Sequence, residues 1–442
     1  MLFTKKEIVK IMVPVLIEQL FAVTVGIADS LMVSSAGEAA ISGVSLVDTI
    51  NVFLVCLFSA LGAGGTIVIS QHLGAKDYTS ANLASKQLVW STFFVAFLIM
   101  LVSILFNKQI LSLVFGSIEP DIMKNAQVYF LFTAMSYPFM GIYNAGISVF
   151  RAMGNTKIAM IDSVVMNIVN ILGNAILIFG FHMGAAGAAI ATLLSRIVGA
   201  VFIMILVGQK KNLIYIDKVF NFKPDFRIIK NILRIGVPNG LENGMFQFGK
   251  ILTQSLVATF GTAQIAANAI GNTLTNIQYI PGQAVGLTIV VVVSRCVGAG
   301  KGQEAKQYTK KLIGVNYAIL WGISAVLCMF AKQIIGFYNL SPEASKIAYQ
   351  LLLINSAAIC VIWPLSFTLP NAFRAASDVK YPMILSATSM WVFRVGLSYV
   401  FGAYLHMGVF GVAFAMICDW IFRTIFFVVR YLRGTWLTKY IS

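Results

Sequence analysis

The sequence predicts an all-α polytopic membrane protein whose twelve transmembrane helices form two pseudo-symmetric six-helix lobes around a central cleft. Three observations favour this fold class. Of the 442 residues, 59% are hydrophobic and only 11% are charged, whereas soluble domains are roughly a quarter charged. The apolar residues form long continuous runs, and the second half of the chain repeats the first. This composition excludes a soluble globular protein, and the high hydrophobicity excludes intrinsic disorder.

Twelve apolar runs are long enough to cross a bilayer, which takes roughly 20 residues. Each is expected to be a helix, because lipid offers no hydrogen-bonding partner to backbone N–H and C=O groups. A transmembrane β-barrel would instead show alternating segments of about ten residues. The expected spans are 10–33, 47–70, 87–106, 126–150, 159–180, 184–207, 232–257, 270–294, 312–331, 347–370, 384–405 and 408–430.

The basic residues set the expected orientation. Of the 32 Lys and Arg residues, 24 precede the first span, follow an even-numbered span or lie in the C-terminal tail. Because cytoplasmic loops carry the excess of Lys and Arg, we expect both termini in the cytoplasm of a multi-pass protein of a prokaryotic cytoplasmic membrane. The net charge of +16 therefore reflects topology, and no nucleic-acid partner is expected.

The chain repeats itself at an offset of 224 residues. Six spans in each half give both halves the same orientation, which is typical of transporter repeats that rock around a midplane site. We expect an N-terminal lobe at 1–207, a basic cytoplasmic linker at 208–231 and a C-terminal lobe at 232–442. The matching positions include Val13-Pro14 and Val237-Pro238, Glu18 and Glu242, Gly62 and Gly286, and His182-Met183-Gly184 and His406-Met407-Gly408.

Two carboxylates share one face of the first span. Glu18 and Asp29 are 11 residues apart, which places them on nearly the same helix face, about 16 Å apart along the axis. An ionisable residue inside a membrane span is a candidate functional group. These two exchange protons if they are buried away from cations, or have a structural role if each pairs with a buried Arg or Lys.

The first span of the second half carries Glu242 among amide side chains. Lys250 is turned away from it by about 80°, so the sequence favours an unpaired Glu242 that faces the cleft. Asn243 and Gln247 lie beside it, and more Asn and Gln residues follow in the next span. We expect them to line a wetted cavity that contacts substrate or protons, while some amides join helices by hydrogen bonds.

For most of the remaining charged residues in the spans we expect a structural role. Asp419 and Arg423 are four residues apart on the last span, a spacing that favours a structural ion pair, which Arg394 would extend. Asp48 and Asp162 lie near predicted span starts, where solvated end residues are expected.

A proline precedes each of the two repeated glutamates by one turn. Pro14 and Pro238 each remove a backbone hydrogen bond within a span and favour a kink. The kinks are either hinges that link protonation to helix shape or static bends.

The sequence lacks the motifs of soluble enzymes and ATP-driven pumps. There is no Walker A, H-E-x-x-H or G-x-S-x-G motif. The five cysteines match no metal-binding spacing. The sequence therefore indicates neither an enzyme nor a cofactor.

Four segments resemble the multidrug and toxic compound extrusion (MATE) transporters, and the resemblance covers nearly the whole chain. Residues 14–33, which end in I-A-D-S-L-M-V, are similar to the first span of that family. S-Q-H-L-G-A-K-D at 70–77 and F-R-A-M-G-N-T-K at 150–157 resemble its motifs after spans 2 and 4. G-A-A-G-A-A-I-A-T at 184–192 resembles the opening of its span 6.

The resemblance implies export of cationic or amphipathic organic compounds, such as drugs and toxins, in exchange for H⁺ or Na⁺. The family's N-lobe ion site implies Asp29, Asn170, Asn174 and Thr192 as the coupling residues here, with Asp29 as the Na⁺ ligand if Na⁺ is used. Asn174 replaces an Asp of the family. Because hard cations prefer carboxylates, this departure favours H⁺. Glu242 matches a span-7 Glu of NorM-type members, whose span-10 acid has no counterpart in 347–370.

The sequence thus predicts a monomeric, cation-coupled antiporter of the lipid bilayer that exports a small organic cation. Neutralising a carboxylate would bias the lobes between outward-open and inward-open states. Two alternatives stay open. A flippase for lipid-linked precursors would use Arg196, Lys250 and Arg394 to hold an anionic headgroup, and an integral membrane enzyme would turn over a lipid without an ion gradient.

Overall fold

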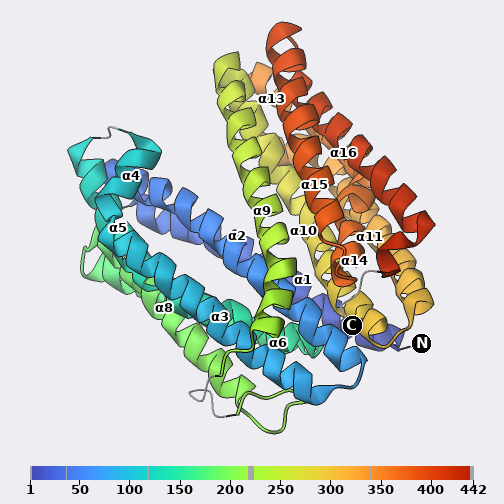
Figure 1. Cartoon of the computed structure of the whole chain (residues 1–442). Helices are drawn as coiled ribbons and strands as arrows, with labels where there is room; N and C mark the ends of the chain where they lie inside the picture. The colour runs from blue at the N-terminus through green and yellow to red at the C-terminus, as the bar shows by residue number, and fades with distance from the viewer. Residues whose placement is uncertain (1, 36, 117–118, 218–222, 339, 439–442) are drawn as a thin grey trace. The chain divides into compact units, whose positions relative to one another are not determined.

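The computed structural model describes residues 2–35, 37–116, 119–217, 223–338 and 340–438, and all regular secondary structure within these ranges is helical (Figure 1). The chain divides into two compact units. We call Lys5–Gly240 the N-terminal unit, and Leu241–Ser442 with Met1–Thr4 the C-terminal unit. The division falls within helix α9 (Phe226–Val257). The boundaries expected from the sequence, at 207 and 232, stay a prediction.

The N-terminal unit packs its apolar residues between α2, α5 and α6. Phe58, Phe130 and Tyr137 are fully buried there, while α7 packs against both α1 and α8. The helices of this unit before α9 are α1 (Lys5–Ser34), α2 (Glu38–Gly74), α3 (Tyr78–Leu105), α4 (Asn107–Phe115), α5 (Pro120–Met135), α6 (Tyr137–Ala152), α7 (Thr156–Asn174), the π-helix η1 (Ala175–Gly180) and α8 (Gly184–Val207).

The C-terminal unit has an aromatic core. Trp363 stacks between Tyr279 and Phe367, with ring centroids 5.4 Å apart on each side. Trp420 meets Phe367 edge-on at 5.7 Å. After α9 its helices are η2 (Ala258–Phe260), α10 (Thr262–Gly298), α11 (Gly302–Met329), α12 (Ala331–Gly336), α13 (Pro342–Val361), η3 (Pro364–Thr368), α14 (Pro370–Ala375), α15 (Lys380–Ser389), η4 (Met390–Gly396), η5 (Tyr399–Tyr404), α16 (Gly408–Arg433) and η6 (Thr435–Thr438).

The helices account for the twelve predicted spans. Nine helical segments among the described residues are long and apolar enough to cross a membrane, and each matches one predicted span. The other three predicted spans are α1, α9 and the α5–α6 pair. The last of these is interrupted at Ser136, so that neither half reaches 18 residues on its own.

The sequence repeat reappears in the backbone. His182 and His406 both have φ of 53°, and Gly184 and Gly408 follow with φ of 55° and 57°. Each turn ends a π-helix, η1 or η5, and begins the last long helix of its half. Positive φ is strained for most L-residues and easy for glycine. The repeated His-Met-Gly therefore encodes a left-handed turn in both halves.

Pro14 and Pro238 lie inside α1 and α9, and both helices continue on either side of the proline. The missing backbone N–H of each proline is therefore tolerated without ending the helix. The hinge role of these two residues stays a prediction.

Candidate functional site

A polar cavity of about 300 Å³ lies in the N-terminal unit between α1, α2, α5, α7 and α8. Three of the expected coupling residues line it together. Asn174 Nδ2 donates to Asn170 Oδ1, and Asn170 Nδ2 donates to Thr192 Oγ1, each over 3.4 Å. Asn170 and Asn174 are buried. Residues on α7 and α8 that are 18 or more positions apart thus form one site.

The fourth expected coupling residue, Asp29, is part of α1. Its side chain is outside the described part of the structure. Gly26 and Val33 of the same helix line the cavity. The position of the Asp29 carboxylate therefore stays a prediction.

Asp48 lines the same cavity, which corrects the expectation of a solvated span end. Its Oδ1 accepts hydrogen bonds from Tyr129 Oη at 3.0 Å and from Asn51 Nδ2 at 3.2 Å. The physical reason is the length of α2, which begins at Glu38, nine residues before the predicted span start. Asp48 therefore lies in the third turn of the helix, where neighbouring helices cover it.

Asp162 is a second correction. The expectation of a solvated carboxylate is wrong, because Asp162 has no exposed surface. Both of its oxygens are buried, and neither has a hydrogen-bond partner in the described ranges. α7 begins at Thr156, so Asp162 lies inside the helix rather than at its end.

A positively charged side chain also lines the N-terminal cavity. Arg196 of α8 lines it and donates from Nη1 to Ser136 Oγ at 2.6 Å. The described lining thus holds one carboxylate, one guanidinium, three amides and four hydroxyls, among them that of Thr192. Carboxylate, amide and hydroxyl oxygens are suitable ligands for a hard cation. Among the described side chains no cluster of three or more His, Cys, Asp or Glu residues is present.

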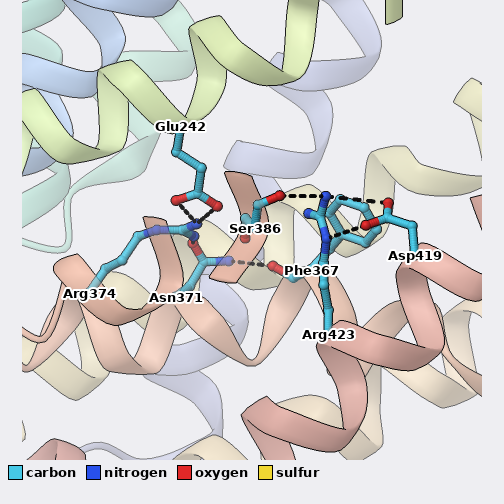
Figure 2. Close-up of polar contacts among 7 residues, drawn as sticks. All are labelled: Glu242, Phe367, Asn371, Arg374, Ser386, Asp419 and Arg423. Carbon is cyan, nitrogen blue, oxygen red and sulfur yellow. Dashed lines mark hydrogen bonds and ion pairs between the residues drawn. The ribbon is translucent and has the colours of Figure 1, made fainter. Parts of the chain in front are cut away.

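The two repeated glutamates are both paired with arginine. Arg151 Nη2 donates to Glu18 Oε1 at 2.6 Å, which is the structural alternative left open for Glu18. Arg374 Nη2 lies 2.7 Å from both oxygens of Glu242 (Figure 2). The expectation of an unpaired Glu242 is wrong. Its partner is 132 residues away on α14, so helical spacing could not reveal it.

The ion pair expected between Asp419 and Arg423 is present and fully buried. Arg423 Nε donates to Asp419 Oδ1 at 2.9 Å, and Nη2 contacts Oδ2 at 3.3 Å (Figure 2). Ser389 also donates to Asp419, and Ser386 O accepts from Arg423. Arg394 makes no ion pair with this carboxylate within the described chain, so it does not join the pair.

A second cavity, of about 650 Å³, lies in the C-terminal unit between α9, α10, α13, η4 and α16. Gln247 lines it, as the amide-rich sequence predicts, but Glu242 and the exposed Asn243 do not. Two cations, Lys250 and Arg394, are part of the lining. The described lining residues include no carboxylate. They are Gln247, Lys250, Ile251, Thr253, Gln254, Ser255, Val257, Ala258, Asn268, Gly271, Asn272, Asn276, Tyr279, Leu351, Asn355, Arg394, Val412, Ala413 and Met416.

Known proteins share this sequence pattern and fold. The family model described as MatE matches residues 14–176 and 238–400, one match in each half at the 224-residue offset. YisQ, an uncharacterized transporter of Bacillus subtilis (strain 168), is 25% identical over 434 residues, which cover 96% of this chain and 94% of that protein. A probable multidrug resistance protein NorM of Thermotoga maritima is 25% identical over 446 residues, with 98% and 93% coverage.

Solved structures with this fold include an outward-facing conformation of a multidrug resistance MATE family transporter of the MOP superfamily. It matches with a TM-score of 0.91 and 21% identity, over 98% of this chain and 97% of that one. The twelve-helix, two-lobe architecture predicted from the sequence is therefore confirmed. At this level of identity the structural likeness concerns the fold alone.

Proposed function

We propose, on the premise that this chain belongs to the MatE family of membrane transporters, that it is a secondary active antiporter. It exports organic compounds in exchange for a cation and acts by transport rather than by catalysis. The observation that supports cation coupling is the N-terminal cavity, where Asp48, Asn170 and Thr192 present oxygen atoms together. Alternating access of two repeats around such sites is the common design of duplicated transporters.

The coupling ion in this proposal is H⁺, with Na⁺ as the alternative. Arg196 lies in the same cavity as Asp48, so bound Na⁺ would meet a fixed positive charge, and Asn174 offers a neutral amide instead of a second carboxylate. Na⁺ is a hard cation and favours anionic oxygen ligands. A proton needs only one carboxylate, either Asp48 or Asp29, and its uptake changes the charge of the cavity by one.

Several features of the proposal rest on the family and on the distribution of charge. The exported compounds are cationic or amphipathic. The chain works as a monomer in the lipid bilayer of a prokaryotic cytoplasmic membrane, with both termini in the cytoplasm, and requires no cofactor and no nucleic acid. Glu18 and Glu242 were expected to attract substrate or carry protons, and their arginine partners favour a conformational role instead.

The test is transport by the purified chain in proteoliposomes under an imposed ΔpH or ΔNa⁺, read with ethidium as a cationic dye. ΔpH should drive more efflux than ΔNa⁺. Asp48→Asn and Asp29→Asn should each lower driven efflux by about tenfold or more, equivalent to ~1.4 kcal/mol. Asp121→Asn is the matched control, because Asp121 is exposed at the start of α5. Wild-type efflux by Asp29→Asn would show that its coupling role is wrong.

A flippase for lipid-linked precursors is the second candidate, favoured by Lys250 and Arg394 in the C-terminal cavity. Such a protein would move an anionic headgroup across the bilayer. In the same proteoliposomes, a flippase would translocate a fluorescent phospholipid-linked sugar faster than it moves ethidium. The antiporter predicts the opposite ranking and a dependence on the ion gradient.

A further inference from the structure

The two cavities occupy equivalent positions in the two halves of the chain. Seven lining residues of the N-terminal cavity align with seven lining residues of the C-terminal cavity at the 224-residue offset. Each unit therefore has a cavity between the equivalent helices of its half. The aligned pairs are Gly26 and Lys250, Val33 and Val257, Val44 and Asn268, Asp48 and Asn272, Asn170 and Arg394, Ala188 and Val412, and Thr192 and Met416.

The charges at these equivalent positions differ. The carboxylate Asp48 is replaced by the amide Asn272, and the hydroxyl of Thr192 by the thioether of Met416. In the other direction, uncharged Gly26 and Asn170 are replaced by cations, and both cations line the cavity. The described lining of one cavity thus holds one carboxylate and one guanidinium, and that of the other holds two cations and no carboxylate.

Arg394 lines the C-terminal cavity. The side chain is half-buried and lies over the ring of Phe246, 5.4 Å from its centroid. No hydrogen bond or ion pair of its guanidinium with any described residue is present. Its five N–H donors are arranged in a planar fork that matches carboxylate, sulfonate and phosphate groups. Arg394 lies in the π-helix η4, and such irregular segments are frequent at functional sites.

The carboxylates of the C-terminal unit do not line this cavity, although Asp419 is near enough to act electrostatically on Arg394. Glu242 pairs with an arginine of α14, Asp378 and Asp419 pair with arginines of α16, and Glu304 pairs with Lys301. Glu343 is exposed in the first turn of α13. These five are all the Asp and Glu residues after Gly240, and none lines the cavity. A positive charge in a partly desolvated cavity is costly unless an anion accompanies it.

The rest of the lining suits an amphipathic molecule. Amides from α10 and α13 supply hydrogen bonds, and Tyr279 and Leu351 supply apolar surface beside them. A cavity of about 650 Å³ is within the size range of sites for small organic ligands. The lining therefore combines positive charge, amides and apolar contact around one space.

We propose that the C-terminal cavity binds the anionic group of an amphipathic organic substrate, with Arg394 as its principal contact and Lys250 as a second cation. The group is a carboxylate, sulfonate or phosphate on an aromatic or aliphatic body. This inference rests on the proposed transport function and narrows its substrate class to amphipathic compounds that carry an anionic group, either anions or zwitterions.

Binding of three dansyl probes that share one fluorophore and differ in charge tests this assignment without any gradient. The purified full chain in detergent is titrated with anionic dansylglycine, neutral dansylamide and cationic dansylcadaverine, and fluorescence is recorded. Dansylglycine should bind at least about tenfold more tightly than dansylamide, which corresponds to ~1.4 kcal/mol. Dansylcadaverine should bind most weakly at this cavity.

The variants assign the effect to residues. Arg394→Gln should weaken dansylglycine about tenfold and leave dansylamide within about twofold, whereas Arg394→Lys should keep part of the affinity because it retains the charge without the fork. Lys250→Gln should cause a smaller loss. Arg196→Gln is the matched control, since it removes the cavity cation of the other unit. Retained dansylamide binding reports that each variant is folded.

The outcomes separate this inference from the proposed function. Equal affinity for dansylglycine and dansylamide, or loss of dansylglycine binding in Arg196→Gln but not in Arg394→Gln, overturns the anion site. Repetition in nanodiscs distinguishes two sources of the anion: competition by phosphatidylglycerol over phosphatidylcholine assigns a lipid headgroup, and lack of competition assigns a soluble compound. Binding with no gradient-driven transport would refute the antiporter and leave the anion site standing.

Discussion

The two units share one helical plan, yet they differ in the charge of their cavities and in the contacts of their buried glutamates. Positions that determine the backbone are kept, such as the left-handed turn at His182 and His406. Positions that line the two cavities differ between the halves: Asp48 is equivalent to Asn272, and Asn170 is equivalent to Arg394. The comparison teaches that the duplicated halves share their architecture while the side chains that line their cavities have diverged.

The buried glutamate pairs show the same divergence in finer detail. Both oxygens of Glu242 contact Arg374, which also donates to Asn371 at 3.0 Å (Figure 2). Glu18 contacts Arg151 through one oxygen only. Its Oε2 is buried with no hydrogen-bond partner in the part of the chain that the structure describes, whereas the arginine Nε lacks such a partner in both pairs. The C-terminal pair is therefore the better satisfied of the two.

The largest effect is expected from breaking these pairs. Glu242→Ala should destabilise the protein by about 3–5 kcal/mol, because it leaves a largely buried arginine without its partner. Glu18→Ala should cost less, since that pair has fewer contacts to lose. Denaturant unfolding in detergent, followed by tryptophan fluorescence, measures both. An equal or larger loss for Glu18→Ala would contradict the ranking, and the double variant Glu242→Ala/Arg374→Ala should recover part of the stability.

A smaller difference is expected at two equivalent glycines of α8 and α16. A Cβ on Gly411 would lie 2.5 Å from the carbonyl carbon of Phe401, whereas a Cβ on Gly187 would lie 3.1 Å from Leu177. Overpacking against backbone costs about 1–3 kcal/mol or more. Gly411→Ala should therefore lower the melting temperature more than Gly187→Ala. Similar melting temperatures for the two variants would show that the backbone of η5 at Phe401 shifts to accommodate the added Cβ at little cost.

The smallest effect concerns the helix starts after α2 and α10. Asp77 caps α3 by accepting a hydrogen bond from Ser80 N at 3.0 Å. The equivalent residue, Lys301, occupies the N-cap position of α11, but its side chain makes no capping hydrogen bond. Asp77→Ala should cost about 1 kcal/mol. Lys301→Ala should cost about 0–1 kcal/mol, the loss of an exposed ion pair with Glu304. Thermal unfolding of the two variants at neutral pH measures the difference.

The cap also predicts a pH dependence. The hydroxyl and backbone N–H of Ser80 donate to Asp77 and hold the pKa of its carboxyl below the usual value. Its stabilisation is thus complete above the unfolded pKa and is lost as pH falls through the lower folded pKa. The difference between wild type and Asp77→Ala should therefore shrink in acid. A difference that stays constant down to the folded pKa would argue against the charged cap.

Much of the proposed coupling site could be predicted, because its residues lie in segments with a recognisable pattern. Asn170, Asn174 and Thr192 were expected to act together, and they line one cavity. Asp48 was missed because hydropathy marks where the apolar stretch begins, and α2 begins nine residues earlier. The small, weakly polar residues between Glu38 and Asp48 are the signal that could have revealed the longer helix.

The sequence by itself determined the helical class, the number of spans and the duplication, because bilayer thickness and backbone hydrogen bonding leave few other solutions. Only the tertiary structure decided which charges meet. The partners of Glu18 and Glu242 lie more than 130 residues away in the chain, and helical periodicity carries no information about such pairs. It also decided which residues share a cavity, and hence that two cavities at equivalent positions differ in charge: the described lining of one holds a carboxylate and a guanidinium, and that of the other holds two cations.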